Sequence, residues 1–228
     1  MNTLSLLRGI RFVDSFFPSG GYAFSSGLEA AVQGGVVRNA EDLTRYVVDW
    51  LRGGMGSREA VATGLARDAA SRGTLSIAVD ADRALEAMQL CRETRMASRQ
   101  MGRQVIRMAC DRDDAPAILR DFLAEVGSGR SPGHLPISLG LTLGTFGWNK
   151  QEAVAAFLYQ NAAGLVSSAL KLLPIGQREG QRLLESWLSL IEKLSREAES
   201  RIEMASWAPI QDIFAMRHSR LESRLFRS

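Results

Sequence analysis

The stretch AVAAFLYQNAAGLVSSAL, from Ala153 to Leu170, contains no Asp, Glu, Lys or Arg. Its eighteen residues reach the length of a membrane-spanning helix. The polar side chains of Gln160, Asn161 and Ser167 argue against a membrane span, because lipid offers them no hydrogen-bond partners. A helix that is apolar on nearly every side instead belongs in the middle of a helical bundle. We therefore predict a buried central helix with the other segments packed around it.

The ends of this helix are marked by capping signals. Asn149 with Glu152 three residues later forms a capping box, and Pro174 stops the helix. A second capping box, Ser26 with Glu29, predicts another helix start. Helical spacing of apolar residues predicts further helices over residues 3–17, 26–35, 39–54, 57–71, 77–110, 113–126, 137–146 and 176–206, the last as one long helix or two.

No stretch alternates long enough to form a strand, so we predict an all-α fold. The domain is expected to be a single bundle of roughly ten helices over residues 1–206, followed by a tail over residues 207–228 that docks on the domain and its partners. The segment 77–110 is long for a globular helix, and a kink near Gly102 is expected there.

The composition is that of an ordinary globular protein, with 46% hydrophobic and 23% charged residues. The net charge is +3, and the opposite charges are interspersed, which argues against a nucleic-acid-binding protein. The first residues lack the pattern of a signal peptide. Cys91 and Cys110 are the only cysteines, which favours a reducing compartment. We predict a cytoplasmic protein that does not bind membranes.

The segment Pro18–Tyr22 (PSGGY) is rich in glycine and could be read as a phosphate-binding loop. It lacks the Gly-Lys-Ser/Thr ending and a preceding strand, so a tight turn between helices is favoured. Tyr22 and Phe24 are unusual on such a turn. Their rings either fill a gap in the bundle or bind a partner.

The two histidines, His134 and His218, lie far apart in the sequence. No motif joins them to cysteines or carboxylates, so neither a metal site nor a nucleophile–base pair is predicted. A loop histidine hydrogen-bonded to backbone is the favoured role for His134. We predict that the protein is not an enzyme and holds no tightly bound cofactor.

The last residues of the chain combine basic and apolar side chains. They are Met216, Arg217, Arg220, Leu221, Arg224, Leu225, Phe226 and Arg227. Two alternatives remain open from composition: a frayed basic terminus, or a segment ordered by docking, with arginines as donors and Leu225–Phe226 as the anchor.

Five blocks of sequence together carry a family resemblance. They are residues 17–29 (FPSGGYAFSSGLE), 95–103 (RMASRQMGR), 133–140 (GHLPISLG), 164–181 with LPIGQ at 173–177, and the tail with DIFAMRH at 212–218 and RLFRS at 224–228. Each block alone is weak, but all five occur in order along nearly the whole chain. The sequence resembles the UreF family of urease accessory proteins.

The resemblance implies an all-helical protein that dimerises and binds the accessory protein UreD, also called UreH. The pair then recruits the GTPase UreG, and the assembly delivers nickel to apo-urease. In this scheme nickel is the cargo, GTP is bound by UreG, and the UreF-like chain is an adaptor. Two other classes stay open: a helical scaffold or regulator of another GTPase, and an enzyme that uses His134 with an acid.

The resemblance and the sequence together give a set of expected partner-binding residues. They are Tyr22, Lys171, Gln177, Asp212, His218, Arg224, Leu225, Phe226 and Arg227. We expect the tail to be loose in the free protein and to become ordered when UreD binds, with Arg224 bonded to the Tyr22 turn. Three positions depart from the family pattern, where relatives usually carry Glu at Ser219, His at Phe24 and a larger residue at Ser26.

Overall fold

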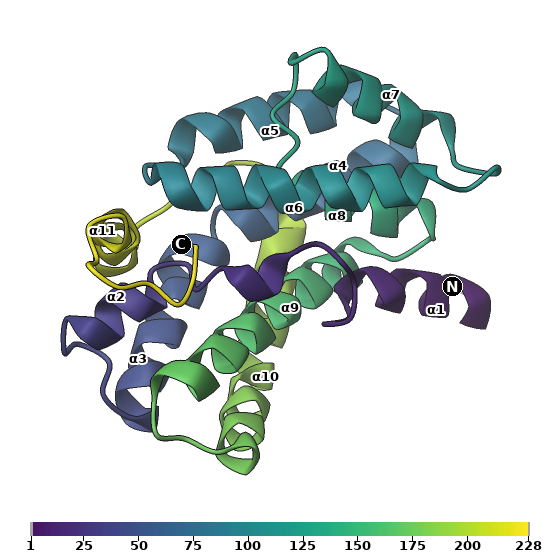
Figure 1. Cartoon of the computed structure of the whole chain (residues 1–228). Coiled ribbons are helices and arrows are strands. Elements are labelled where there is room, and N and C mark those ends of the chain that lie inside the picture. The colour runs from purple at the N-terminus through teal and green to yellow at the C-terminus, as the bar shows by residue number, and fades with distance from the viewer. Residues whose placement is uncertain (1, 228) are drawn as a thin grey trace.

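The computed structural model describes residues 2–227, and all its regular elements are helical. The α-helices are α1 (Thr3–Val13), α2 (Leu28–Gln33), α3 (Ala40–Trp50), α4 (Glu59–Arg72), α5 (Leu75–Met88), α6 (Arg92–Cys110), α7 (Ala117–Gly127), α8 (Leu135–Thr145), α9 (Lys150–Leu172), α10 (Gln177–Ser200) and α11 (Pro209–His218). A 3₁₀ turn, η1 (Gly21–Ala23), and a π-helix, η2 (Leu51–Met55), interrupt them. Figure 1 shows one bundle in which α5, α6 and α7 lie at one end and α9 and α10 at the other. The predicted all-α bundle is confirmed.

Helix α8 is the element most completely enclosed by the bundle. Its first nine residues, from Leu135 to Leu143, are all buried. Gly140 allows its backbone to approach α4, since a Cβ atom there would lie 2.3 Å from the carbonyl oxygen of Thr63. Apolar residues on every side, with no charged residue, explain why α8 can be surrounded by α4, α6 and α9.

Helix α9 shares the central position, but it leaves one side open to solvent. Its predicted capping box is present, with the Asn149 side chain accepting from the Glu152 backbone and the Glu152 carboxylate accepting in return. By length and composition α9 could cross a membrane, yet half of its most apolar stretch is buried inside the protein. The side chains of Gln160 and Asn161 donate to the carbonyl oxygens of Phe12 and Phe157. The bond from Gln160 reaches another helix and supplies a partner that lipid would withhold.

The long helix predicted over residues 77–110 is wrong, because the chain breaks between α5 and α6. The backbone is extended at Gln89, and two arginine side chains bind the carbonyl groups released by the break. Arg58 donates to the Met88 oxygen over 3.3 Å, and Arg95 donates to the Gln89 oxygen over 3.2 Å. No Gly or Pro marks this break, since the bonds that stabilise it come from elsewhere in the fold.

Gly102 lies inside α6, and the element is a single uninterrupted α-helix there, so the expected kink is also wrong. The glycine serves close packing, because a Cβ atom at this position would lie 2.3 Å from the carbonyl oxygen of Gly133. Gly102 thus lets the loop before α8 rest directly on the α6 backbone.

Two boundaries near the start of the chain differ from the predictions. Helix α1 ends at Val13, four residues before Phe17, and the Asp14 side chain accepts from the Phe16 backbone over 2.6 Å. Helix α2 has no side-chain cap; its N-cap residue is Gly27, and Ser26 itself has a positive φ of 52°. The Ser26 capping box is therefore wrong. The Glu29 carboxylate instead binds the C-terminal tail.

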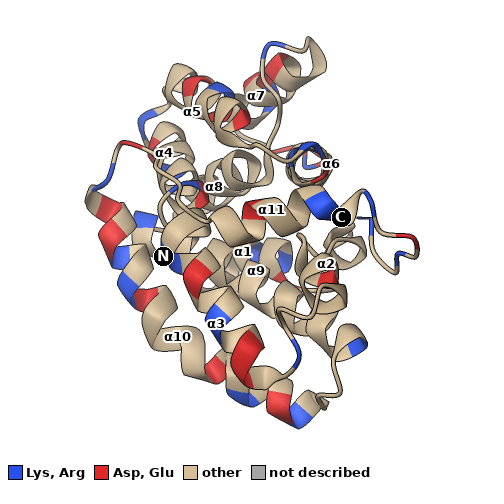
Figure 2. Cartoon of the chain, turned by 90° about the vertical axis from the view of Figure 1, so that its left-hand side faces the viewer, with Lys and Arg blue, Asp and Glu red and all other residues tan. Residues whose placement is uncertain are grey.

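The segment between α10 and α11 crosses over η2. The Trp207 backbone donates to the carbonyl oxygen of Gly53 over 2.6 Å, and Ala205 donates to that of Ser57 over 3.0 Å. Gly53 is needed for this approach, since a Cβ atom there would lie 2.2 Å from the Trp207 oxygen. This crossing brings α11 alongside α2 (Figure 2).

Candidate functional site

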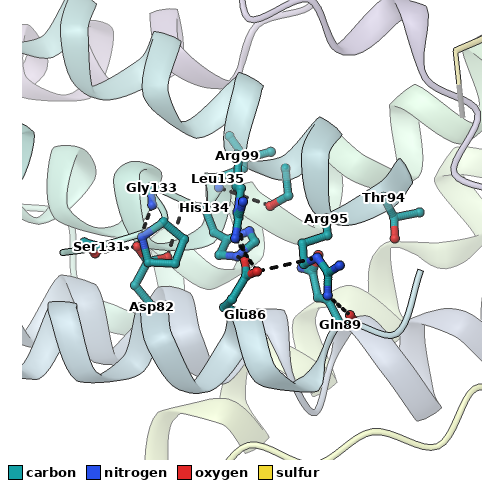
Figure 3. Close-up of polar contacts among 12 residues, drawn as sticks. Asp82, Glu86, Gln89, Thr94, Arg95, Arg99, Ser131, Gly133, His134 and Leu135 are labelled. Carbon is teal, nitrogen blue, oxygen red and sulfur yellow. Dashed lines mark hydrogen bonds and ion pairs between the residues drawn. The ribbon is translucent and has the colours of Figure 1, made fainter. Parts of the chain in front are cut away.

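Two buried polar clusters stand out in the bundle, and the first lies beneath the loop before α8. Asp82 on α5 accepts three hydrogen bonds from this loop (Figure 3). They come from the Ser131 hydroxyl at 2.6 Å, the Gly133 backbone at 2.6 Å and the His134 backbone at 3.0 Å. All of these atoms are removed from solvent, so the carboxylate fixes the path of residues 131–134.

Glu86, one turn further along α5, binds the ring of His134. The His134 Nε2–H donates to the Glu86 carboxylate over 2.8 Å, and Arg99 Nε donates to it over 2.9 Å. The Nε atom of Arg95 lies 3.5 Å from Oε1 of the same carboxylate (Figure 3). Burial alone would raise the pKa of Glu86, but the bonds from His134 and Arg99 outweigh it and lower the pKa. Glu86 is therefore a carboxylate at neutral pH.

His134 is completely buried, and burial lowers its pKa despite the opposing effect of Asp82 and Glu86. The ring is neutral at pH 7 and donates from Nε2. Its Nδ1 has no hydrogen-bond partner among residues 2–227. The sequence analysis predicted that the His134 side chain binds backbone. The prediction of its partner is wrong, because the ring binds the Glu86 carboxylate. Within the described chain, no three His, Cys, Asp or Glu side chains are grouped to hold a metal ion.

The second cluster holds the C-terminal tail on α2. Glu29 is 2% exposed and accepts from three groups of the tail. The His218 ring donates over 2.8 Å, the Leu225 backbone over 2.6 Å and the Phe226 backbone over 3.1 Å. Burial alone would raise the pKa of Glu29, but the bonds from Leu225, His218 and Phe226 together lower it. A single carboxylate thus binds both ends of the segment 218–226.

Further contacts extend the docking of the tail. Phe226 is buried, with the Lys171 ammonium 5.2 Å from the centre of its ring. The Arg227 backbone donates to the Ala23 oxygen over 2.8 Å, and the Gln33 side chain donates to the Ser223 oxygen over 3.1 Å. The tail therefore reaches α2, η1 and α9 in the isolated chain.

Helix α11 is docked by one polar side chain and carries an acidic residue that faces a small cavity. The Gln211 side chain donates to the Tyr46 oxygen over 2.9 Å. Asp212 lines a cavity of about 70 Å³ together with Arg58 and Glu59. Burial raises the pKa of the Asp212 carboxyl, Arg58 opposes this shift, and Glu59 adds to it.

Comparison with known sequences decides the family. A sequence model of the UreF family matches residues 37–188. The protein named urease accessory protein UreF in Bacillus sp. (strain TB-90) is 31% identical over 225 residues, which cover 98% of this chain and 99% of the relative. The chain belongs to the UreF family. A relative of the same name in Cereibacter sphaeroides is 32% identical, with 98% and 99% covered. Urease accessory protein UreF 1 of Brucella melitensis is 32% identical, with 97% and 92% covered.

The structure shows why separate blocks of this UreF-family sequence belong together. The block at 95–103 lies against the block at 133–140, where Gly102 touches the Gly133 backbone and Arg99 shares Glu86 with His134. The block at 17–29 lies against the tail, where Glu29 binds residues 218–226. The lysine at 171, from the fourth block, reaches the same tail.

The expected partner-binding residues fall into two groups. His218 and Phe226 are buried in the docked tail, Lys171 contacts it, and Asp212 lies half-buried on α11. Lys171 is also solvent-exposed, as are Tyr22, Gln177, Arg224, Leu225 and Arg227. In the described residues of the isolated chain, no hydrogen bond joins Arg224 to the Tyr22 turn, and Tyr22 is 78% exposed. The tail is bound by Glu29 instead, without any partner present.

Sequence reasoning missed the three acidic residues that organise both clusters, Asp82, Glu86 and Glu29. Asp82 and Glu86 stand one helical turn apart on α5, but nothing local shows that the loop 131–134 covers them. Glu29 was assigned to a helix cap. The signal that could have found it is its place in a block that matches the family, directly after fourteen residues without charge.

Proposed function

We propose that this chain is an adaptor in urease maturation, which joins UreD/UreH and recruits the GTPase UreG for GTP-dependent insertion of nickel into apo-urease. Membership in the family of urease accessory proteins supports the general role. The observation that carries the proposal is the docked tail. The tail is anchored by the buried side chains of His218 and Phe226. The side chains of Arg224 and Leu225 on the tail, and of Tyr22 in η1, are exposed to a partner.

The proposed adaptor acts in the cytoplasm as a homodimer and does no chemistry of its own. Nickel is its cargo, and no cofactor is part of the chain. The donor set supports this assignment, because nickel favours imidazole and thiolate ligands held together. In residues 2–227 the two histidines are each committed to a separate glutamate, so they offer no common site.

The tail would serve as the element that reports the binding of UreD. Loosening of the tail in the free protein requires release of the Glu29 bonds, and it stays a prediction. Ordering a segment costs about 1–2 kcal/mol per residue in backbone entropy, so a partner that covers the tail shifts this equilibrium strongly. Hydrogen exchange of the tail amides, measured with and without UreD, follows the equilibrium directly.

The deciding experiment is affinity capture from cells that express the urease subunits and all accessory proteins. The tagged chain is expected to retain UreD, UreG and urease. Tyr22→Ala and Arg224→Ala should keep the fold and much of the UreD binding while losing UreG and urease activation. Arg182→Ala on the exposed side of α10 is the matched control. Capture of a GTPase without UreD or urease would support the scaffold of another GTPase instead.

A further inference from the structure

A groove runs between the loop before α2 and the outer side of α6. It has a volume of about 730 Å³ and opens to solvent. Its lining residues are Pro18, Ser19, Gly20 and Phe24 from the loop, Glu93, Met96, Ala97, Arg99, Gln100, Arg103, Gln104 and Arg107 from α6, and Arg227 from the tail. No contact described above occupies it.

The charge of this groove is strongly one-sided, with four arginines against the single carboxylate of Glu93. Two of the arginines are already engaged, because Arg99 binds Glu86 and Arg103 donates to the Pro132 oxygen over 3.2 Å. The guanidinium groups of Arg107 and Arg227 are exposed and have no hydrogen bond or ion pair within the described chain. Figure 2 shows basic residues of α6 close to the C-terminal end.

The remaining lining suits a peptide better than a small anion. Pro18, Phe24 and Met96 form apolar surface, and Met96 is 54% exposed. The α6 residues involved run from Glu93 to Arg107, which is about 21 Å at the helical rise of 1.5 Å per residue. An extended segment of about six residues has the same length. A single carboxylate or phosphate would leave most of this surface uncovered.

We propose that the groove binds an acidic peptide segment of a partner protein. Carboxylates of the segment pair with Arg107 and Arg227, whose planar guanidinium groups donate to both oxygens of a carboxylate in bidentate geometry. An apolar side chain of the segment lies against Met96 and Phe24. The proposal rests on the adaptor function and names the kind of partner surface that this adaptor takes.

The tail completes this site. The Arg227 backbone is bound to the Ala23 oxygen, and the preceding residues are bound to Glu29. The second unpaired guanidinium therefore reaches the groove only when the tail is docked. Binding of an acidic segment and docking of the tail stabilise each other, because each favours the same position of Arg227.

The direct test is a fluorescence anisotropy titration of the full chain with a labelled peptide, Asp-Glu-Leu-Asp-Glu with blocked ends. Arg107→Gln combined with Arg227→Gln is expected to weaken binding about tenfold or more. Arg72→Gln combined with Arg182→Gln removes the same net charge from exposed positions elsewhere and should leave the affinity within about twofold. Equal weakening in both double variants would overturn the site, because net charge alone would then explain binding.

A second variant lowers the positive charge of the groove without touching its arginines. Gln100→Glu combined with Gln104→Glu adds two negative charges on the outer side of α6, so that the four arginines face three carboxylates. Weaker binding of the acidic probe at unchanged melting temperature supports the proposal. Unchanged binding of the acidic probe would contradict it.

Other anions are separated by competition and by the probe itself. Replacing the central Leu of the peptide by Ser should weaken binding, since Met96 and Phe24 lose their contact. If inorganic phosphate or a short single-stranded RNA displaces the probe and the Leu-to-Ser change has no effect, the groove is a general anion site and the peptide proposal fails.

Affinity capture distinguishes this inference from the adaptor function. If the unmodified chain captures no urease accessory protein, the adaptor function fails whatever the groove binds. If the unmodified chain captures them and the Arg107→Gln, Arg227→Gln variant captures them equally well, the adaptor function stands and the groove proposal fails.

Discussion

The bundle contains two pairs in which a buried histidine binds a glutamate, with the same distance and different surroundings. In each pair the Nε2 atom lies 2.8 Å from a glutamate oxygen. Glu86 and His134 are 48 residues apart, and Arg95 and Arg99 also contact this glutamate. Glu29 and His218 are 189 residues apart, and no arginine contacts Glu29 within the described chain.

The difference shows how one chemical motif supports either a fixed or a releasable connection. The His134 pair lies where α5, α6 and α8 pack together, so it cannot open without disturbing the core. The His218 pair joins the domain to a tail whose neighbouring residues Arg217, Arg220 and Arg224 are exposed. Opening the Glu29–His218 pair breaks only the contacts between the tail and the rest of the domain. Substitutions at the two carboxylate clusters should therefore affect global and local stability differently.

The largest effect is expected for Asp82→Ala. The change leaves the Ser131 hydroxyl and the backbone donors of Gly133 and His134 without a partner in a buried place. The free energy of unfolding should fall by about 3–5 kcal/mol. Urea unfolding followed by circular dichroism measures this, with exposed Asp80→Ala as the control. Equal stability of the two variants would mean that the loop is held by packing alone.

Glu29→Ala should act on the tail and leave the core in place. Three donors of residues 218–226 lose their acceptor, at a cost of about 2 kcal/mol to tail docking. The open fraction of the tail then rises about 30-fold. Limited trypsin digestion after Arg217, Arg220 and Arg224 reports it, while the helical circular dichroism signal stays near that of the unmodified chain. Exposed Glu222→Ala is the control. Equal protection of the tail in both variants would contradict the role of Glu29 in holding the tail on α2.

The pH dependence of stability should come in part from His134. Its pKa is lowered in the folded protein, so below the ordinary value near 6.5 the unfolded chain takes up a proton that the folded chain does not. Stability is fully present above that value and falls as the pH drops toward the folded pKa, by at most about 1.4 kcal/mol per pH unit. His134→Gln should flatten this slope between pH 6.5 and 5.5. Ser98→Ala, which disturbs the same loop without removing a titrating group, should keep it.

The smallest effect on stability is expected at Lys171 and Gln177. Lys171→Ala removes an ammonium beside the Phe226 ring, worth about 0.5–1 kcal/mol, and should speed tail proteolysis slightly. Gln177→Ala removes an exposed side chain at the start of α10 and should leave proteolysis unchanged. Both variants should fold normally and alter partner capture. Unchanged capture of UreD and UreG, equal to that of exposed Lys193→Ala, would reduce this corner to a structural turn.

Much of the fold could be predicted because its signals are local. The capping residue Asn149 and the helix-stopping Pro174 act within a turn of their own positions. The break at Gln89 could not be predicted, since Arg58 and Arg95 stabilise it through their side chains. The role of Gly102 could not be predicted either, because it depends on close contact with the backbone of Gly133, which is distant in the sequence.

The candidate site was predictable only in part. The family blocks pointed to the tail and to the loop of His134, but the carboxylates that bind them are separated by up to 197 residues from their donors. A glutamate at the start of a helix looks like a capping residue in sequence. Only tertiary structure shows that Glu29 faces the other end of the chain.

The order in which the chain is synthesised has a consequence for the tail. Helix α2 and Glu29 leave the ribosome early, whereas Leu225 and Phe226 follow 196 and 197 residues later. The helices between them are therefore made before the acceptor meets its donors. A chain cut before residue 218 would keep these helices and expose an empty Glu29 site on α2.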